Sequence, residues 1–197
     1  LMRVSQLVTD IEHIEKLDIN PLFLGDSWAS AVDASVIVRY SSTPSPLHLV
    51  ISPYPNEFEN KVFREGFGEL LIRPIRPEDA PLLLSLYESL SPRSIYMRFF
   101  TPLRNFQNSM LVRFTQIDYD REIALVAIQE FEGEEKMLGV SRVIQDIKQN
   151  HAEFAVIVSD ACQGKGIGAE LLSQCLSIAK GRGIENVMGD VLTENKQ

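Results

Sequence analysis

The sequence has few cysteines, no long apolar run and no excess of basic charge, and each absence excludes a class of protein. Two cysteines in 197 residues are too few for a disulfide framework of the secreted type. No apolar stretch approaches the roughly 20 residues that a membrane-spanning helix needs, and no signal peptide is visible. The formal net charge of −8 argues against general nucleic-acid affinity, which requires a basic face. We therefore expect a soluble, cytoplasmic protein that binds neither nucleic acid nor membrane.

Low-complexity segments are also missing, and a hydrophobic content of 45% is enough for a packed core. The length allows one large domain or two small ones. The chain begins at Leu1 rather than at a methionine, so we expect it to be a segment of a longer protein. Cys162 could act as a nucleophile in principle, but no motif pairs it with a histidine, which favours a small packing residue.

The most informative stretch is the glycine-spaced segment Gln163–Gly168, which lies between a predicted strand and a predicted helix. Residues 152–158 are rich in β-branched and aromatic side chains and predict the strand. Apolar residues at helical spacing from Ile167 to Ile178 predict the helix. Glycines let the backbone approach an anion closely, and the free N–H groups at a helix start point toward it. The segment fits neither the P-loop pattern nor the dinucleotide spacing Gly-x-Gly-x-x-Gly. A glycine-rich turn with a structural role is the alternative.

The segment does match the pattern Gln/Arg-x-x-Gly-x-Gly/Ala, with Gln163, Gly166 and Gly168 at its three defined positions. In this it resembles the pyrophosphate loop of the GNAT superfamily of acetyl-CoA-dependent N-acyltransferases. The resemblance implies an α/β (α+β) GNAT fold, in which helices flank a mixed central sheet, and acetyl-CoA as the acyl donor. Residues 69–79, a strand followed by Arg-Pro and then Glu-Asp, are similar to the start of many such domains.

The same resemblance implies a set of cofactor-binding residues. Three strand residues would bond the pantetheine arm through their backbone: Val156, Ile157 and Val158. The loop and helix start would bind the pyrophosphate: Gln163, Gly164, Lys165, Gly166, Ile167, Gly168 and Ala169. Lys165 would add a positive charge there, and a solvated surface lysine is the alternative. Asn195 lies where these proteins often place an asparagine near the pantetheine. No metal site is implied.

Glu153 is the predicted general base, because the acceptor amine must lose a proton before it can attack a thioester. A single Glu in an otherwise apolar strand is unusual, and burial would raise its pKa toward a value useful for proton removal. The alternative is a Glu at the strand edge that faces water or pairs with an arginine. His151 is the rival base, although its place at the strand entry favours a turn residue. Strand alternation places residues 153, 155 and 157 on one face, unless a bulge intervenes.

The pattern along the chain predicts two domains joined by a linker. Residues 1–40 are expected to contain a helix over 1–16, a short strand ended by Asn20-Pro21, and a strand over 29–38. Residues 41–68 are rich in Pro and Ser and predict the linker, whose aromatic residues suggest that it packs against a neighbour. Residues 69–197 would form the GNAT domain, with a strand over 186–192 and a helix starting at Thr193, and it looks truncated at its C-terminus.

The segment 17–22 resembles the end of an ATP-grasp domain of acyl-CoA synthetases, in which an acidic residue and an asparagine hold magnesium against nucleotide phosphates. Asp18 and Asn20 match those positions, but an Asx turn that ends a strand is the favoured interpretation here. ATP and magnesium would matter only if the remainder of such a domain were functional.

Together the two parts are similar to the C-terminal part of protein lysine acetyltransferases, in which an acyl-CoA-synthetase-like region is fused to a GNAT domain. The matching segments include residues 96–100, Tyr-Met-Arg-Phe-Phe. The resemblance implies that the partner is a protein with a target lysine, notably an acyl-CoA synthetase. The alternatives are an N-acetyltransferase for a small amine and a non-catalytic module that senses acyl-CoA. The oligomeric state and the acyl-chain preference do not follow from the sequence.

Overall fold

The computed structural model describes residues 2–26, 28–43, 45, 48–49, 52–101, 106–146 and 151–194. The chain divides into two compact units, Leu1–Pro53 and Tyr54–Gln197. None of the helices in these described ranges is long and apolar enough to cross a membrane.

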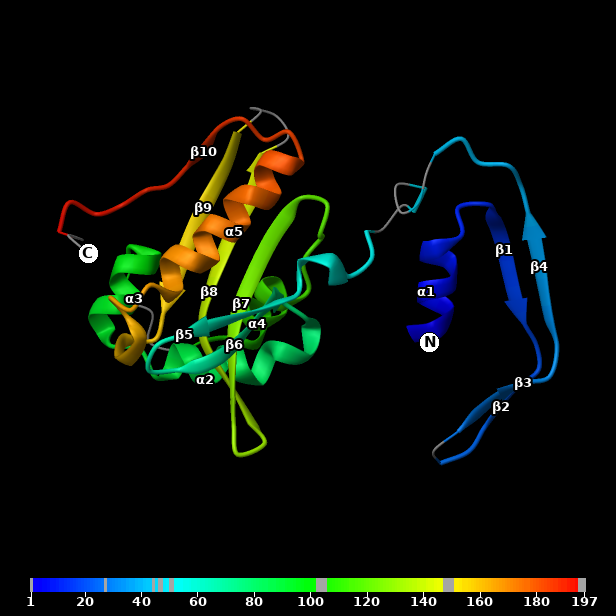
Figure 1. Cartoon of the computed structure of the whole chain (residues 1–197), viewed down its shortest axis with the longest axis horizontal. Helices are drawn as coiled ribbons and strands as arrows, with labels where there is room; N and C mark the ends of the chain where they lie inside the picture. The colour runs from blue at the N-terminus through cyan, green and yellow to red at the C-terminus, as the bar shows by residue number, and fades with distance from the viewer. Residues whose placement is uncertain are drawn as a thin grey trace. The chain divides into compact units, whose positions relative to one another are not determined.

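The first unit consists of one helix and two small antiparallel sheets (Figure 1). Its elements are α1 (Met2–Asp10), β1 (Ile14–Ile19), β2 (Leu22–Leu24), β3 (Ala29–Ala31) and β4 (Ala34–Val38). The expected helix over 1–16 is wrong beyond Asp10, because Ile14 begins a strand that pairs with Val38. The strand expected over 29–38 is two strands, and between them Asp33 accepts a hydrogen bond from the Asn20 N–H at 3.2 Å.

The second unit is built on a six-stranded mixed sheet with the order β10-β9-β8-β7-β6-β5. The strands are β5 (Asn60–Arg64), β6 (Gly68–Pro74), β7 (Glu122–Phe131), β8 (Glu134–Asp146), β9 (His151–Val158) and β10 (Val187–Met188). Neighbouring strands are antiparallel except for β9 and β10, which are parallel. The mixed central sheet expected from the sequence is confirmed.

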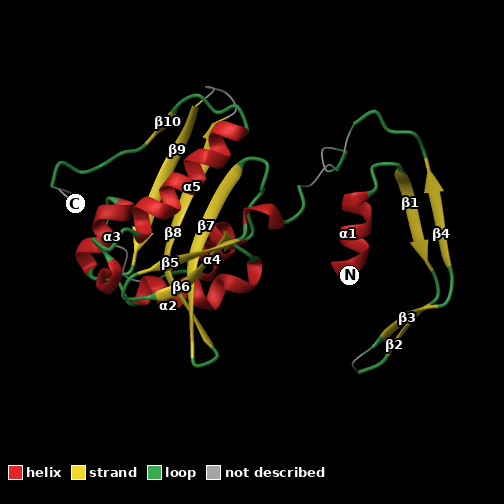
Figure 2. Ribbon diagram, in the orientation of Figure 1, coloured by secondary structure: helices red, strands yellow, loops and turns green. Residues whose placement is uncertain are grey.

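Helices cover both faces of this sheet (Figure 2). They are α2 (Ala80–Glu88), α3 (Pro92–Phe99), α4 (Asn108–Thr115) and α5 (Ile167–Gly181), with 3-10 turns η1 (Asn56–Phe58), η2 (Pro77–Asp79) and η3 (Asp160–Cys162). The α5 helix packs on one face in a cluster that includes Leu125, whereas α2 and α4 pack on the other with Val126. Successive β7 residues are therefore buried on opposite faces, which explains the continuous apolar run in that strand.

The expected linker over 41–68 differs from the structure after Pro53. Residues from Tyr54 onward belong to the second unit, and β5 forms the edge strand of its sheet. Phe58 and Phe67 pack against the buried cluster under α5. The aromatic residues in this Pro-rich stretch were the signal for this packing, because their burial stabilises a segment whose backbone composition favours a turn or a linker.

The chain after α5 also differs from expectation. The strand expected over 186–192 is limited to Val187–Met188. A Cβ on Gly189 would lie 2.3 Å from Phe154 Cε1, so the Phe154 ring occupies the space that a side chain at this position would need. Thr193 and Glu194 form a turn rather than a described helix, and Asn195 lies outside the described residues.

Candidate active site

The glycine loop joins η3 to α5 and presents an open backbone surface. Gly164 and Gly166 have φ values of +71° and +81°, a conformation that glycine adopts with little strain. A Cβ at either position would meet no atom within 4 Å. These two glycines are therefore required by backbone conformation, and the space beside them is free for a ligand.

The start of α5 supplies hydrogen-bond donors next to that space. The Glu170 N–H is bonded to the Gly166 carbonyl at 3.0 Å and closes the first turn. Within the described part of the chain, no hydrogen bond is found from the N–H groups of Ile167, Gly168 or Ala169. Unpaired N–H groups and the positive end of the helix dipole together favour an anion at this position.

Gly168 sets how closely α5 approaches β9. A Cβ there would lie 3.2 Å from Val158 Cγ2 and 3.4 Å from Val156 Cγ1, tighter than ordinary van der Waals contact at the first of them. Because Gly168 has no side chain, the start of α5 can pack closely against the end of β9. The predicted loop and the predicted pantetheine-binding strand residues are brought together at this contact.

The far edge of β9 is open beyond its first three residues. The Ala152 N–H donates to the Asn186 carbonyl at 2.9 Å, and pairing with β10 ends where Glu153 meets Met188. Backbone groups of alternate residues point the same way, so those of Val156 and Val158 face this edge. The Val158 carbonyl accepts a hydrogen bond from Gln163 Nε2 at 3.1 Å there. The two parallel strands therefore separate where the sequence predicts the acyl-donor arm.

Ile157 differs from Val156 and Val158, the other two residues predicted to bind the pantetheine arm. It is in register with Val140 of β8, and its carbonyl points toward Gly139, so its backbone belongs to the β8 ladder. Its side chain is buried against α2 and α4. We assign Ile157 to the core rather than to the open edge, because an uninterrupted register places only even-numbered residues there.

The Gln163 side chain stabilises the loop through three hydrogen bonds. Its Nε2 atom donates to the Val158 carbonyl at 3.1 Å, to Asp160 Oδ1 at 3.0 Å and to Ser94 Oγ at 3.2 Å. Asp160 also accepts from the Ser91 N–H at 2.7 Å, which ties η3 to the start of α3. Burial opposes the charged form of Asp160, but hydrogen bonds from Ser94 and Ser91 outweigh it and lower the pKa of the carboxyl group.

Lys165 is exposed, and its ammonium group lies at the loop. Its Nζ donates to the Ala161 carbonyl at 2.8 Å and lies 5.1 Å from the centroid of the Phe67 ring. The positive charge expected near the pyrophosphate is thus present at the loop.

Glu153 lies on the opposite face of the sheet from α5. Its register places it on the side of Ile157, which packs against α2 and α4, and no bulge interrupts β9 in this register. The side chain is exposed, so the burial assumed for it from the sequence is absent. His151, the rival base, is half-buried at the start of β9 opposite Asp146.

The guanidinium of Arg98 on α3 and the carboxylate of Glu153 interact electrostatically. Burial is the main cause that lowers the pKa of Arg98, and the positive charge of Arg142 lowers it further. Electrostatic interactions with Tyr87 and Glu153 raise it in part. In the part of the chain that the structure describes, Arg98 has no hydrogen bond or ion pair, and its guanidinium lies 4.9 Å from the Phe99 ring centroid.

A buried charge cluster on the same face was missed from the sequence. The side chains of Arg142 and Glu122 are 2% and 5% exposed and form an ion pair. The other Glu122 oxygen binds Arg113 at 2.9 Å, and Arg142 also donates to the Phe114 carbonyl. Glu153 was singled out because it is a charged residue in an apolar strand. Glu122 and Arg142 are also charged residues in apolar strands, so the same criterion would have identified this cluster.

The site fits the diphosphate and arm of an acyl-CoA. Open glycines, unpaired amides at a 15-residue helix start and a held lysine suit a diphosphate. The free edge of β9 suits an extended chain with amide groups, which can add to a strand edge. Glu153 lies on the face of the sheet opposite α5.

Comparisons with known proteins agree with this geometry. Residues 69–197 match the family described as acetyltransferase (GNAT) domain, and residues 1–38 match the family described as ATP-grasp domain. A Pseudomonas aeruginosa protein named as an acetyltransferase is 30% identical over 118 residues, which are 60% of this chain and 63% of that protein. This chain therefore spans less than two thirds of that relative.

Among solved structures, the GNAT domain of S. lividans PAT is 31% identical, with a TM-score of 0.65 over 73% of this chain and 84% of that one. An N-acetyltransferase from Staphylococcus aureus is 21% identical, with a TM-score of 0.52 over 64% of this chain and 76% of that one, and shows the likeness of fold alone.

Proposed function

This chain belongs to the GNAT acetyltransferase family, and from that premise we propose that it transfers an acetyl group from acetyl-CoA to the ε-amine of a lysine on a protein. The observation that carries the proposal is the placement of Glu153. Glu153 lies on β9, the same strand that has the open edge. The end of β9 lies against the start of α5.

The donor would be held by backbone groups. The amides from Gly164 to Ala169 would bind the diphosphate, and the backbone of Val156 and Val158 would bind the pantetheine arm. Acetyl-CoA supplies the activated acetyl thioester. The chain's own contribution is to fix the thioester between the separating strands β9 and β10, so that the acceptor approaches from the Glu153 face.

Glu153 would accept the proton of the lysine ammonium. An ammonium has no lone pair, so attack on the thioester requires proton removal first. As the amide bond forms, the thioester C–S bond would break and CoA would leave as its thiolate, which solvent would protonate. Exposure of Glu153 suits this role when the acceptor arrives on another protein, because docking covers the carboxylate and excludes water.

An acyl-CoA synthetase is the proposed acceptor. The support is the order of domains, since an ATP-grasp match over residues 1–38 precedes the GNAT match in this chain, as in the fused lysine acetyltransferases that the sequence resembles. A small amine would need no such fusion, and a non-catalytic sensor would need no carboxylate at position 153.

The test compares the full chain with its Glu153→Gln and Glu185→Gln variants. Glu185 is an exposed glutamate that forms no side-chain ion pair among the described residues, and it serves as the matched control. Calorimetry measures acetyl-CoA binding, and mass spectrometry measures acetylation of an acyl-CoA synthetase and of spermidine. We expect unchanged binding in both variants and a roughly 10²- to 10⁴-fold loss of transfer to the protein only in Glu153→Gln.

Other outcomes would contradict the proposal in distinct ways. Transfer to spermidine but not to the protein would support the small-amine alternative. Binding without transfer to either acceptor would support an acyl-CoA sensor. Full activity of Glu153→Gln would remove Glu153 as the base.

A further inference from the structure

The turn between β5 and β6 lies against the glycine loop and the first turn of α5. Arg64 at the end of β5 forms an ion pair with Glu170 of α5, and Phe67 lies under the Lys165 ammonium at 5.1 Å. Farther along, Asn60 and Gln174 exchange two hydrogen bonds of 2.8 and 3.3 Å. The edge strand is thus attached along the side of the helix that begins the candidate donor site.

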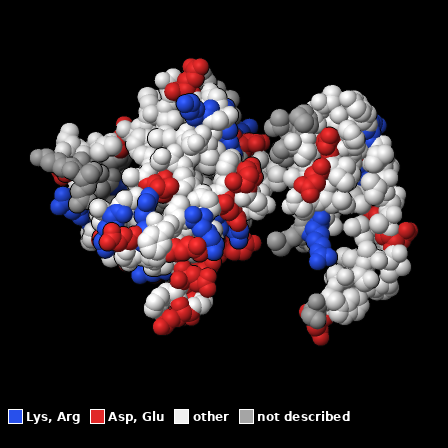
Figure 3. Space-filling view, in the orientation of Figure 1, with Lys and Arg blue, Asp and Glu red and all other residues white. Residues whose placement is uncertain are grey.

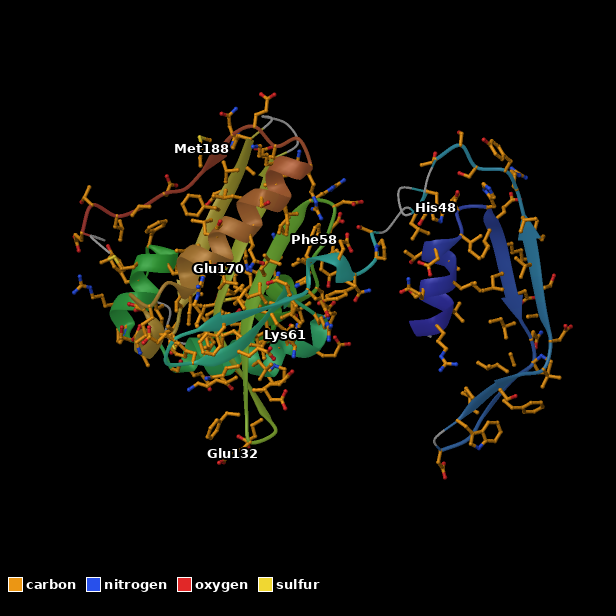
Figure 4. All side chains as sticks on the ribbon, viewed as in Figure 1. His48, Phe58, Lys61, Glu132, Glu170 and Met188 are labelled. Carbon is orange, nitrogen blue, oxygen red and sulfur yellow. The ribbon has the colours of Figure 1, made fainter. Side chains whose placement is uncertain are left out.

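Glu170 is the acidic residue in the first turn of α5. Figure 4 shows it on α5 beside β5. A carboxylate in the first turn is stabilised by the helix dipole, and for the same reason it competes with any other anion bound at the helix start. A free carboxylate at position 170 would therefore repel a diphosphate held by the neighbouring amides.

Both carboxylate oxygens of Glu170 accept hydrogen bonds on the side of α5 that faces β5. Arg64 donates to Oε2, and Gln174 Nε2 donates to Oε1 at 2.8 Å. The Arg64 and Glu170 side chains are only 34% and 27% exposed, so solvent screens this pair less than an ordinary surface pair. Acidic and basic groups lie side by side over this region in Figure 3.

We propose that Arg64 is a positioning residue for the donor: it neutralises Glu170 and thereby makes the start of α5 favourable for the acyl-CoA diphosphate. This inference rests on the donor assignment of the proposed function. It gives the edge strand β5, the first strand of the second unit, a role in donor binding that its linker-like sequence does not suggest.

The experiment measures dissociation constants by calorimetry for two ligands, acetyl-CoA and S-acetylpantetheine, which lacks the diphosphate. The variants are Arg64→Met, Glu170→Gln and their combination. Lys61→Met is the control, because Lys61 lies on the same strand but pairs with Glu69 of β6 at 2.6 Å (Figure 4).

Charge compensation predicts changes of opposite sign. Arg64→Met should weaken acetyl-CoA binding about tenfold at low salt, because Glu170 is then an uncompensated negative charge. Glu170→Gln should tighten it, because Arg64 is then free to attract the diphosphate. The double variant should bind nearly as the unaltered chain does, Lys61→Met should change nothing, and each difference should shrink as salt rises. Binding of S-acetylpantetheine should stay unchanged throughout.

The opposite sign for Glu170→Gln keeps the test valid even if Arg64→Met folds poorly, since misfolding cannot tighten binding. Equal losses for both ligands, or a loss in Glu170→Gln, would overturn the charge role and leave β5 as structural support only. Failure of the unaltered chain to bind acetyl-CoA is a different result, because it would contradict the donor assignment itself.

Discussion

Gly168 of α5 and Val158 of β9 are placed so closely that a Cβ on the glycine would lie 3.2 Å from Val158 Cγ2. The contact joins the two elements that would hold the donor. Its closeness depends on the missing side chain, since the helix start cannot move inward past the valine methyl group. Gly168, the last defined position of the loop pattern, therefore acts through helix packing, whereas Gly164 and Gly166 act through backbone conformation.

The first prediction is that Gly168→Val separates α5 from β9. Overpacking of this kind costs about 1 to 3 kcal/mol of folding free energy and should also weaken acetyl-CoA binding. Urea unfolding and calorimetry measure the two effects. Gly181→Ala is the control on the same helix, because a Cβ there meets nothing within 4 Å and alanine favours a helix. Equal stability of Gly168→Val and the unaltered chain would contradict the packing role.

The second prediction concerns the buried pair of Glu122 and Arg142. Glu122→Gln leaves the Arg142 side chain, only 2% exposed, without its counter-ion. Breaking one partner of a buried pair costs about 3 to 5 kcal/mol, which urea unfolding can measure.

The matched change is Arg113→Met, which removes the exposed partner of the same carboxylate. Arg142 still neutralises the buried Glu122 carboxylate in this variant. The exposed Arg113 charge contributes about 1 kcal/mol or less, so the variant should remain close to the unaltered chain. If the two variants lost the same stability, the burial of Arg142 would not be the cause.

The sequence predicts the central sheet and the glycine loop because their patterns are local. The β-branched and aromatic residues of the strand over 152–158 and the spacing of Gly164, Gly166 and Gly168 are visible without tertiary information. The exposure of Glu153 cannot be predicted from such local patterns. The same local sequence in a strand can be covered by a helix in one fold and left open to solvent in another.

Contacts between distant segments account for what sequence patterns missed. Arg64 meets Glu170 across 106 positions, and Arg142 meets Glu122 across 20. A hydrophobic pattern carries no information about which charges will pair. The β5 segment was taken as part of a linker for a similar reason: its pairing with β6 outweighs the turn-favouring composition of the residues before it.

The third prediction is that Cys175 stays unmodified in the folded protein. Burial raises the pKa of its thiol to about 11, and Sγ lies 3.6 Å from the Ser141 carbonyl in the core. At pH 8 about one thiol in a thousand would then be ionised, and the thiolate is the reactive form. Iodoacetamide labelling followed by mass spectrometry should show modification only after unfolding in urea. Rapid labelling of Cys175 in the native state would mean that α5 opens readily.

The last prediction is that the junction between η3 and α3 weakens in acid. The pKa of Asp160 is lowered in the folded state, since hydrogen bonds from Ser94 and Ser91 outweigh the opposing effect of burial. The folded state therefore binds the proton less readily than the unfolded state does. The carboxylate contributes stability above its unfolded pKa near 3.8, and that contribution is lost as the pH falls through the lower folded value.

Asp160→Asn should accordingly be less stable than the unaltered chain at pH 7, and the difference should shrink toward zero as the pH falls below 3.8 and through the lower folded pKa of Asp160. Thermal unfolding between pH 7 and pH 2.5 measures it. Asp190→Asn is the control, because Asp190 is exposed and makes no side-chain hydrogen bond in the described structure. Gln163 binds Asp160 and the Val158 carbonyl with the same amide group, so loss of the carboxylate should also loosen the glycine loop. A difference between the two proteins that stayed constant with pH would show that the Asp160 charge does not hold this junction.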